Sequence, residues 1–160
     1  MNKEILLIAE QLKDAYEGKP WFGRSMKEIL DEIHPSIALQ KPNGQHSILE
    51  LLWHVITWKE FTLSRLRDDR ALPLTYFEQN DWRDLDHSDP KCWQQGLDQL
   101  AKLHNELIGL IQQQQDDLLS QPVRDRNYDF RKLLHGIVQH DIYHLGQIAY
   151  VKKIVENQAC

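Results

Sequence analysis

Hydrophobic residues recur every three to four positions over most of the chain, and prolines, glycines and polar runs divide this helical pattern into segments. The pattern predicts helices at residues 2–17, 26–33, about 48–67, about 91–119 and about 129–156. No alternation typical of a strand persists. We therefore expect an all-α fold, a four-helix bundle with a long crossover connection, formed by a single domain over residues 1–160.

Cap residues and breakers set the expected helix ends. Ser25 and Ser47 precede two of the helices, and each is followed three positions later by a glutamate, which is the sequence of a capping box. A loop begins at Pro35, and residues 68–90 form the polar crossover. We expect the aromatic residues of this crossover to pack it onto the helices: Tyr76, Phe77 and Trp82.

The last predicted helix has polar residues at positions that should face the core. Its seam advances by steps of four and three residues through Leu133, Ile137, His140, His144, Gln147, Val151 and Ile154. His140 and His144 are four residues apart, so both rings project from one helix face and can hold one metal ion between them. Burying an unsatisfied imidazole costs about 1–3 kcal/mol. Either a hydrogen-bond network or a metal ion must therefore satisfy this pair.

Two histidines hold a metal ion poorly, because catalytic zinc-type sites use three protein ligands and a water. His54 is a candidate third ligand, since it lies in mid-helix at the edge of an apolar stripe and one turn before Trp58. A rim histidine that hydrogen-bonds a neighbour is the alternative. We expect His104 and His135 on exposed helix faces. The other histidines fall in the predicted loops: His34, His46 and His87.

Composition and charge narrow the class of protein. The formal net charge is −5 and no basic block stands out, so we do not expect nucleic-acid binding. No apolar run approaches the length of a membrane span, and residues 1–9 lack the long apolar region of a signal peptide. Cys92 and Cys160 do not suggest a disulfide framework. We therefore expect a cytoplasmic protein without a membrane segment.

Three stretches of the chain resemble the DinB/YfiT-like family of metalloenzymes, the DinB superfamily: Pro20–Gly23, His46–Trp58 and Gly136–Ile148. The resemblance implies a four-helix bundle, commonly a homodimer, with one divalent metal ion held by three histidines. The matching positions are His54, His140 and His144, and all three are histidine here. The resemblance thus favours a metal ion over a hydrogen-bond network.

The resemblance also suggests a chemistry. Imidazole ligands suit zinc or nickel, and also copper or iron. Relatives of this fold include transferases and isomerases that depend on low-molecular-weight thiols. The leading hypothesis is an enzyme whose metal ion activates a thiol cofactor for S-transfer to a small-molecule substrate. Hydrolysis by a metal-activated water, and metal binding without turnover, are the alternatives.

Several side chains near the predicted triad are candidates to assist. Asp141 follows His140 as glutamate does in HExxH zinc proteases, although an exposed helix acid is the more ordinary interpretation. Gln147 lies one turn beyond His144 and either orients a metal-bound ligand or bonds a ring nitrogen. Trp58 is a candidate pocket wall, and Tyr143 either lines a pocket or packs between helices. Neither cysteine has the setting of a nucleophile.

Overall fold

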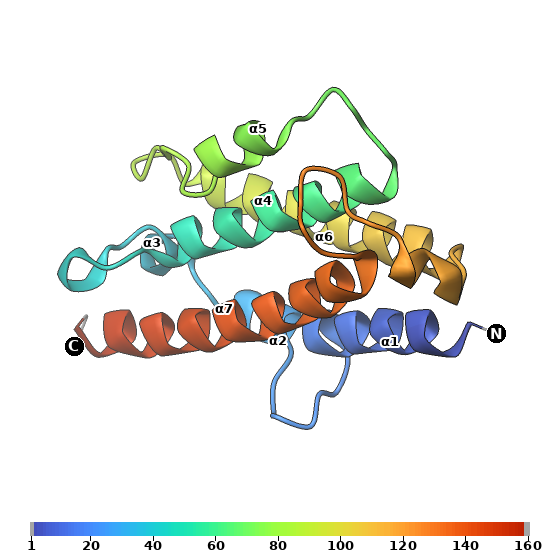
Figure 1. The fold of residues 1–160 in the computed structure, drawn as a ribbon. Coiled ribbons are helices and arrows are strands. Elements are labelled where there is room, and N and C mark those ends of the chain that lie inside the picture. Colours follow the sequence, from blue (N-terminus) through green and yellow to red (C-terminus); the bar gives the residue numbers. More distant parts are fainter. Residues whose placement is uncertain (1, 159–160) are drawn as a thin grey trace.

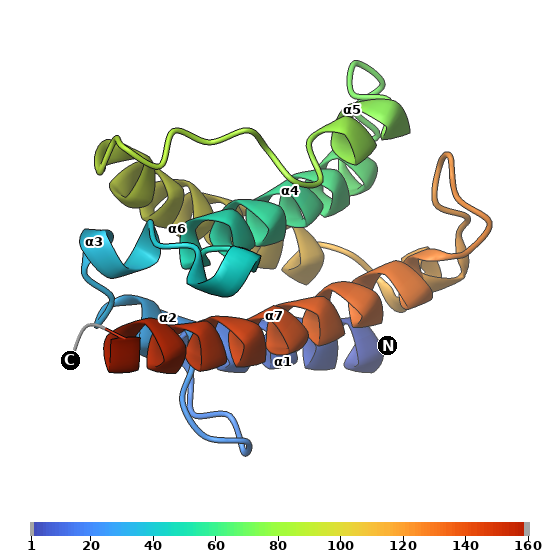
Figure 2. The same ribbon diagram turned by 90° about the vertical axis from the view of Figure 1, so that its left-hand side faces the viewer.

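Residues 2–158 are described by a computed structural model, and over that range the chain is helical with no strand. The four longest helices are α1 (Lys3–Glu17), α4 (Ile48–Leu66), α6 (Lys91–Gln112) and α7 (Phe130–Gln158). Helices α1 and α4 each pack against both α6 and α7, so the four surround a shared core (Figures 1 and 2). The predicted all-α class is confirmed.

Local sequence signals set several helix ends as predicted. The Ser47 hydroxyl accepts a hydrogen bond from the Glu50 backbone at 3.1 Å, and the Glu50 carboxylate accepts one from the Ser47 backbone at 2.8 Å. This capping box satisfies two of the N–H groups that a helix start leaves unpaired. Ser25 and Glu28 form the same box at the start of α2 (Met26–Leu30). Glu50 therefore completes the cap, as the sequence predicted.

Other segments differ from the sequence prediction. The loop expected from Pro35 begins with a short helix, α3 (Pro35–Ala38), which the His34 side chain caps, and a 3-10 turn follows at Pro42–Gly44. Helix α6 ends at Gln112 rather than near residue 119, and a 3-10 helix spans Asp116–Ser120. The Asp116 carboxylate accepts a hydrogen bond from the Ile5 backbone at 3.0 Å. Asp116 thus caps the start of α1, and this contact keeps the segment around Asp116 from continuing helix α6.

The crossover packs onto the core as expected. It contains a short helix, α5 (Leu74–Gln79), whose Phe77 is fully buried against Phe61 of α4. Tyr76 and Trp82 contact neighbouring rings but stay partly exposed. Within residues 2–158, no helix has the length and apolar character needed to cross a membrane. Cys92 is a free thiol, and Cys160 lies outside the described residues.

The prediction that His104 is exposed was wrong. Its side chain is fully buried, and its ring lies 4.2 Å from that of Tyr16 of α1 between centroids, with the two ring planes tilted by 30°. The physical reason is its position in α6, because it lies one turn from Leu100 and from Leu107 on the buried face. Burial is the largest cause that lowers the His104 pKa to about 3, so the ring is neutral. His135 is half-buried, with Nε2 at 3.4 Å from the Glu4 carboxylate.

Candidate metal centre

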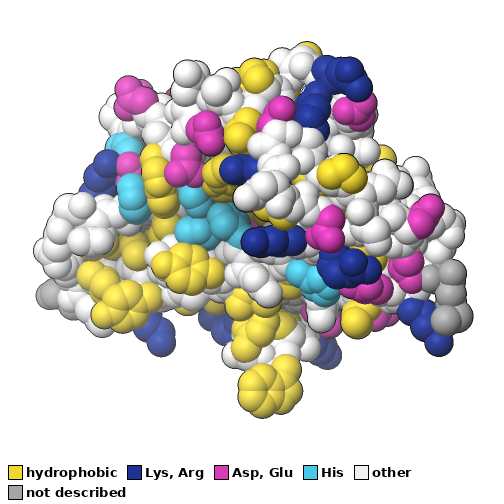
Figure 3. All heavy atoms as spheres, viewed as in Figure 1, with side chains coloured by type: hydrophobic (Ala, Val, Ile, Leu, Met, Phe, Trp, Pro, Cys, Tyr) yellow, Lys and Arg dark blue, Asp and Glu magenta, His cyan; other side chains and the backbone are white. Residues whose placement is uncertain are grey.

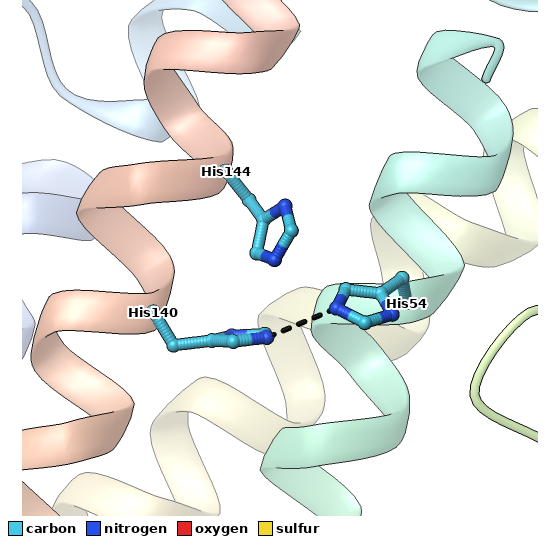
Figure 4. Close-up of side chains that lie close together, drawn as sticks. All are labelled: His54, His140 and His144. Atoms are coloured by element: carbon cyan, nitrogen blue, oxygen red, sulfur yellow. Dashed lines mark hydrogen bonds between the residues drawn. The ribbon is translucent and has the colours of Figure 1, made fainter. Parts of the chain in front are cut away.

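The three histidines identified in the sequence come together between α4 and α7. His54 projects from α4, and His140 and His144 project from successive turns of α7 toward it (Figure 4). One ring nitrogen of each lies within 4.8 Å of the others, and the Nε2 atoms of His54 and His140 are 3.1 Å apart. These two residues, 86 positions apart in sequence, meet because α4 packs against α7.

Two of the rings are oriented by carbonyl groups. The Nδ1 atom of His54 lies 3.0 Å from the Asp81 backbone oxygen, and that of His144 lies 2.6 Å from the Gln147 side-chain oxygen. A carbonyl oxygen only accepts hydrogen bonds, so each Nδ1 carries the proton and each Nε2 presents a lone pair. The Nδ1 atom of His140 is buried and has no partner among residues 2–158.

The surroundings keep the three rings neutral. Burial is the largest cause that lowers the pKa of His140 to about 3 and that of His144 to about 4. It also lowers the pKa of His54, although hydrogen bonding to Asp81 acts in the opposite direction. The charges of the neighbouring histidines add to the effect at His140 and His144. Neutral imidazole is the form that binds a metal ion.

The donor set fits a divalent ion. Nitrogen ligands lie about 2.0–2.1 Å from zinc, which places two tetrahedral ligands about 3.4 Å apart. The 3.1 Å between His54 and His140 is close to that separation. The Nε2 atoms of His54 and His144 are left to ligate by the bonds on the far side of each ring, and one ring nitrogen of each of the three histidines lies within 4.8 Å of the others. The three histidines can therefore hold one metal ion.

Crossover residues that sequence reasoning did not assign complete the surroundings of His54. Trp82 stacks on the His54 ring at 4.2 Å and, more closely, on the His46 ring at 3.7 Å. The Trp58 indole donates a hydrogen bond of 2.7 Å to the carboxylate of Asp81. No sequence signal distinguished Asp81 from the other acids of this polar segment. Only the packing of the crossover over α4 reveals its contact with the triad.

Asp141 is not the exposed helix acid that the sequence favoured. It is 2% exposed, and its carboxylate forms an ion pair of 2.5 Å with Lys59 of α4, which is fully buried. Asp141 lies one turn from Ile137 and from Leu145, so it faces the core. Burial raises the Asp141 pKa, while Lys59 acts in the opposite direction. The pairing leaves this carboxylate engaged by an ammonium group instead of free to act as a base.

Lys59 was also missed, although the sequence contains a signal for it. Leu52, Ile56, Lys59 and Leu63 follow one another at steps of four, three and four residues, which is the spacing of a buried seam. A lysine in such a seam interrupts it as His140 interrupts the seam of α7. The buried ion pair joins the two helices that carry the triad.

The remaining candidates are placed as follows. Trp58 lines a cavity of about 220 Å³ that reaches His140. Gln147 accepts the hydrogen bond from His144, and its amide nitrogen lies 3.4 Å from the Tyr143 hydroxyl. Tyr143 meets the His144 ring edge-on but is 64% exposed and lies outside that cavity. Figure 3 shows histidine atoms at the surface of this face of the molecule; within the triad, His140 is partly exposed, whereas His54 and His144 are buried.

Comparison with known proteins assigns the chain to a family. A search of curated proteins finds no match to the chain. The family model of the DinB superfamily matches residues 19–148, which include all three histidines, the whole of α4 and the first two thirds of α7. The match covers most of the chain, and the chain belongs to the DinB superfamily.

Proposed function

We propose that the protein is a metal-dependent enzyme that binds one divalent ion, zinc or nickel, through His54, His140 and His144. The observation that carries the proposal is the convergence of three neutral imidazoles, two of them held in the ligating tautomer, beside an open cavity. A bound divalent ion supplies Lewis acidity, which lowers the pKa of a water or thiol that coordinates it. A cavity next to the ligands argues for a substrate and against metal storage alone.

We propose S-transfer with a low-molecular-weight thiol as the reaction class. A free thiol has a pKa of about 8.5 and bulk water one of about 15.7, so a thiol needs less assistance. The described residues offer little of that assistance, because no carboxylate lines the cavity that reaches His140, Asp141 is paired with Lys59, and the Asp81 carboxylate accepts a hydrogen bond from Trp58 and lies 3.1 Å from Nδ1 of His54. Hydrolysis, the second candidate, requires a base that these residues do not supply.

Metal analysis tests the first step. Inductively coupled plasma mass spectrometry of the purified protein should find about one divalent ion per chain. Each of the variants His54→Ala, His140→Ala and His144→Ala should lack this ion. His135→Ala is the matched control, since this histidine lies in the same helix and contacts Glu4 instead of the triad. Wild-type protein that takes up neither zinc nor nickel would refute the proposal.

Thiol binding tests the reaction class. Cobalt-substituted protein should develop a sulfur-to-cobalt absorption band when cysteine, N-acetylcysteine or glutathione is added. The band should be absent from the His144→Ala variant. A loaded protein whose spectrum none of these thiols changes would contradict S-transfer while leaving the metal site intact.

We also propose that the protein forms a homodimer, as the family resemblance implies. The loop between α1 and α2 projects from the body of the molecule and presents a fully exposed Trp21 and a half-exposed Phe22 (Figure 1). Light scattering coupled to size exclusion should give twice the mass of the chain, and Trp21→Ser should shift it toward the monomer. A wild-type protein of monomeric mass at micromolar concentration would contradict this proposal.

A further inference from the structure

The cavity beside His140 has aromatic and apolar walls. Trp58 and Phe61 of α4 form one side, and Ile137 of α7 forms the other. Tyr128, in the loop before α7, and His140 of α7 also line it. A volume of about 220 Å³ accommodates a small organic molecule with an apolar body. Its position allows one end of that molecule to reach the triad.

Two cations near the Tyr128 ring have no carboxylate partner among residues 2–158: Lys132, which lines the cavity, and Arg126, which lies beside it against rings that line it. The guanidinium of Arg126 lies 5.3 Å from the Phe61 ring centre, 5.7 Å from Trp58 and 5.9 Å from Tyr128. The Lys132 ammonium lies 5.6 Å from Tyr128. Within residues 2–158, neither side chain forms an ion pair, and the buried Nε of Arg126 has no hydrogen-bond partner. A cation held among rings with its donors unused is suited to bind an anion.

A glycine of α7 helps to keep the cavity open. Gly136 lines it, and a Cβ placed there would meet no atom within 4 Å. A glycine inside a helix costs about 1 kcal/mol relative to alanine, so the position is one where a side chain would stabilise the helix. No close approach of another element requires glycine here. A larger residue at this position would project into the space that we assign to a ligand.

We propose that the substrate is a small molecule with an aromatic or aliphatic body and an anionic group such as a carboxylate. Arg126 and Lys132 bind the anionic group, the walls formed by Trp58 and Phe61 hold the body, and the reacting end points to His140. This inference rests on the proposed function for the role of the triad. The anion site itself is formed by residues outside the triad.

Calorimetric titration of the protein as purified tests the proposal with 3-phenylpropionate and its neutral counterpart 3-phenylpropan-1-ol. The acid should bind at least about ten times more tightly than the alcohol, as expected for a charge-assisted contact. Arg126→Gln should abolish most of this preference. Lys132→Met should reduce it about two- to fivefold, because Lys132 is exposed to solvent. Lys102→Met is the matched control on the exposed face of α6 and should change nothing.

The same titration after metal removal separates this inference from the proposed function. If Arg126 and Lys132 form the anion site, the metal-free protein still binds the acid more tightly than the alcohol. Equal binding of acid and alcohol, or a preference that disappears with the metal and survives Arg126→Gln, would overturn the anion site. A chain that binds no metal but still selects the acid would refute the proposed function alone.

A cavity-filling pair of variants checks the location. Gly136→Leu should abolish binding of 3-phenylpropionate, whereas Gly109→Leu should leave it unchanged. Gly109 is a matched control, since it lies inside helix α6 and a Cβ placed there would also meet no atom within 4 Å. Undiminished binding to a folded Gly136→Leu variant would show that the ligand lies elsewhere and would overturn the proposal.

Discussion

Removing the buried ammonium of Lys59 should destabilise the fold more than any exposed charge change. In Lys59→Met, a side chain of similar length replaces the lysine and leaves Asp141 buried at 2% exposure without its partner. Its Oδ1 atom already lacks a hydrogen-bond partner within residues 2–158. Breaking a buried pair from one side costs about 3–5 kcal/mol, because the remaining charge must be desolvated without compensation. We expect a loss of that size in the free energy of unfolding.

The double variant Lys59→Met/Asp141→Leu makes the argument specific to charge. With both charges gone, no ion is buried at this position, and the stability should return to within about 1–2 kcal/mol of the wild type or exceed it. Lys27→Met is the control, since Lys27 pairs with Asp31 on the surface and both side chains are about half exposed. That pair should contribute at most about 0.5 kcal/mol.

Urea unfolding followed by circular dichroism measures all of these proteins. The coupling energy from the cycle should be larger than about 2 kcal/mol in magnitude, because the two residues are in contact. The reasoning is refuted if Lys59→Met has the same free energy of unfolding as Lys27→Met. It is also refuted if the double variant is as unstable as Lys59→Met alone. In that case water or a rearranged side chain satisfies Asp141.

Three further predictions follow from the site and its surroundings. Gln147→Leu removes the acceptor that orients His144, and zinc affinity measured by competition with a chelator should fall about 10- to 100-fold; an unchanged affinity would contradict the orienting role. His104 has a folded pKa of about 3 and an ordinary value of 6.5, so the unfolded chain takes up the proton first. Its contribution to stability is complete above pH 6.5 and is lost as the pH falls toward 3, by up to about 1.4 kcal/mol per unit, and His104→Phe should flatten the slope seen in urea unfolding. Gly136→Ala should raise the free energy of unfolding by about 0.5–1 kcal/mol, and a decrease would show that the glycine is needed for packing.

The sequence predicted the helices well where local signals act. The capping boxes at Ser25 and Ser47 and the 3.6-residue periodicity depend only on neighbours in the chain, so α2 and α4 begin where expected. The end of α6 was misplaced because Asp116 caps α1, a contact 111 residues away in sequence. A helix end set by a distant partner has no signal in its own segment.

For the candidate site as well, the sequence predicted the features that depend on neighbours in the chain. The sequence alone identified the three histidines as candidate metal ligands. Two of them share a helix face at four-residue spacing, and the third occupies the matching position of the family resemblance. It also indicated Gln147, which the same spacing places one turn from His144. Each of these inferences uses the helix period and the identity of the side chain.

Only the tertiary structure decided what surrounds these residues. Asp81 and Trp82 reach His54 because the crossover folds over α4, and Asp141 is buried because Lys59 of α4 lies opposite it. The helix period tells which residues share a face, but the packing of helices decides which faces meet and whether a polar group finds a partner there. The free energy of a buried charge depends on that partner. The role of Asp141 as a structural ion pair was therefore not readable from its own helix.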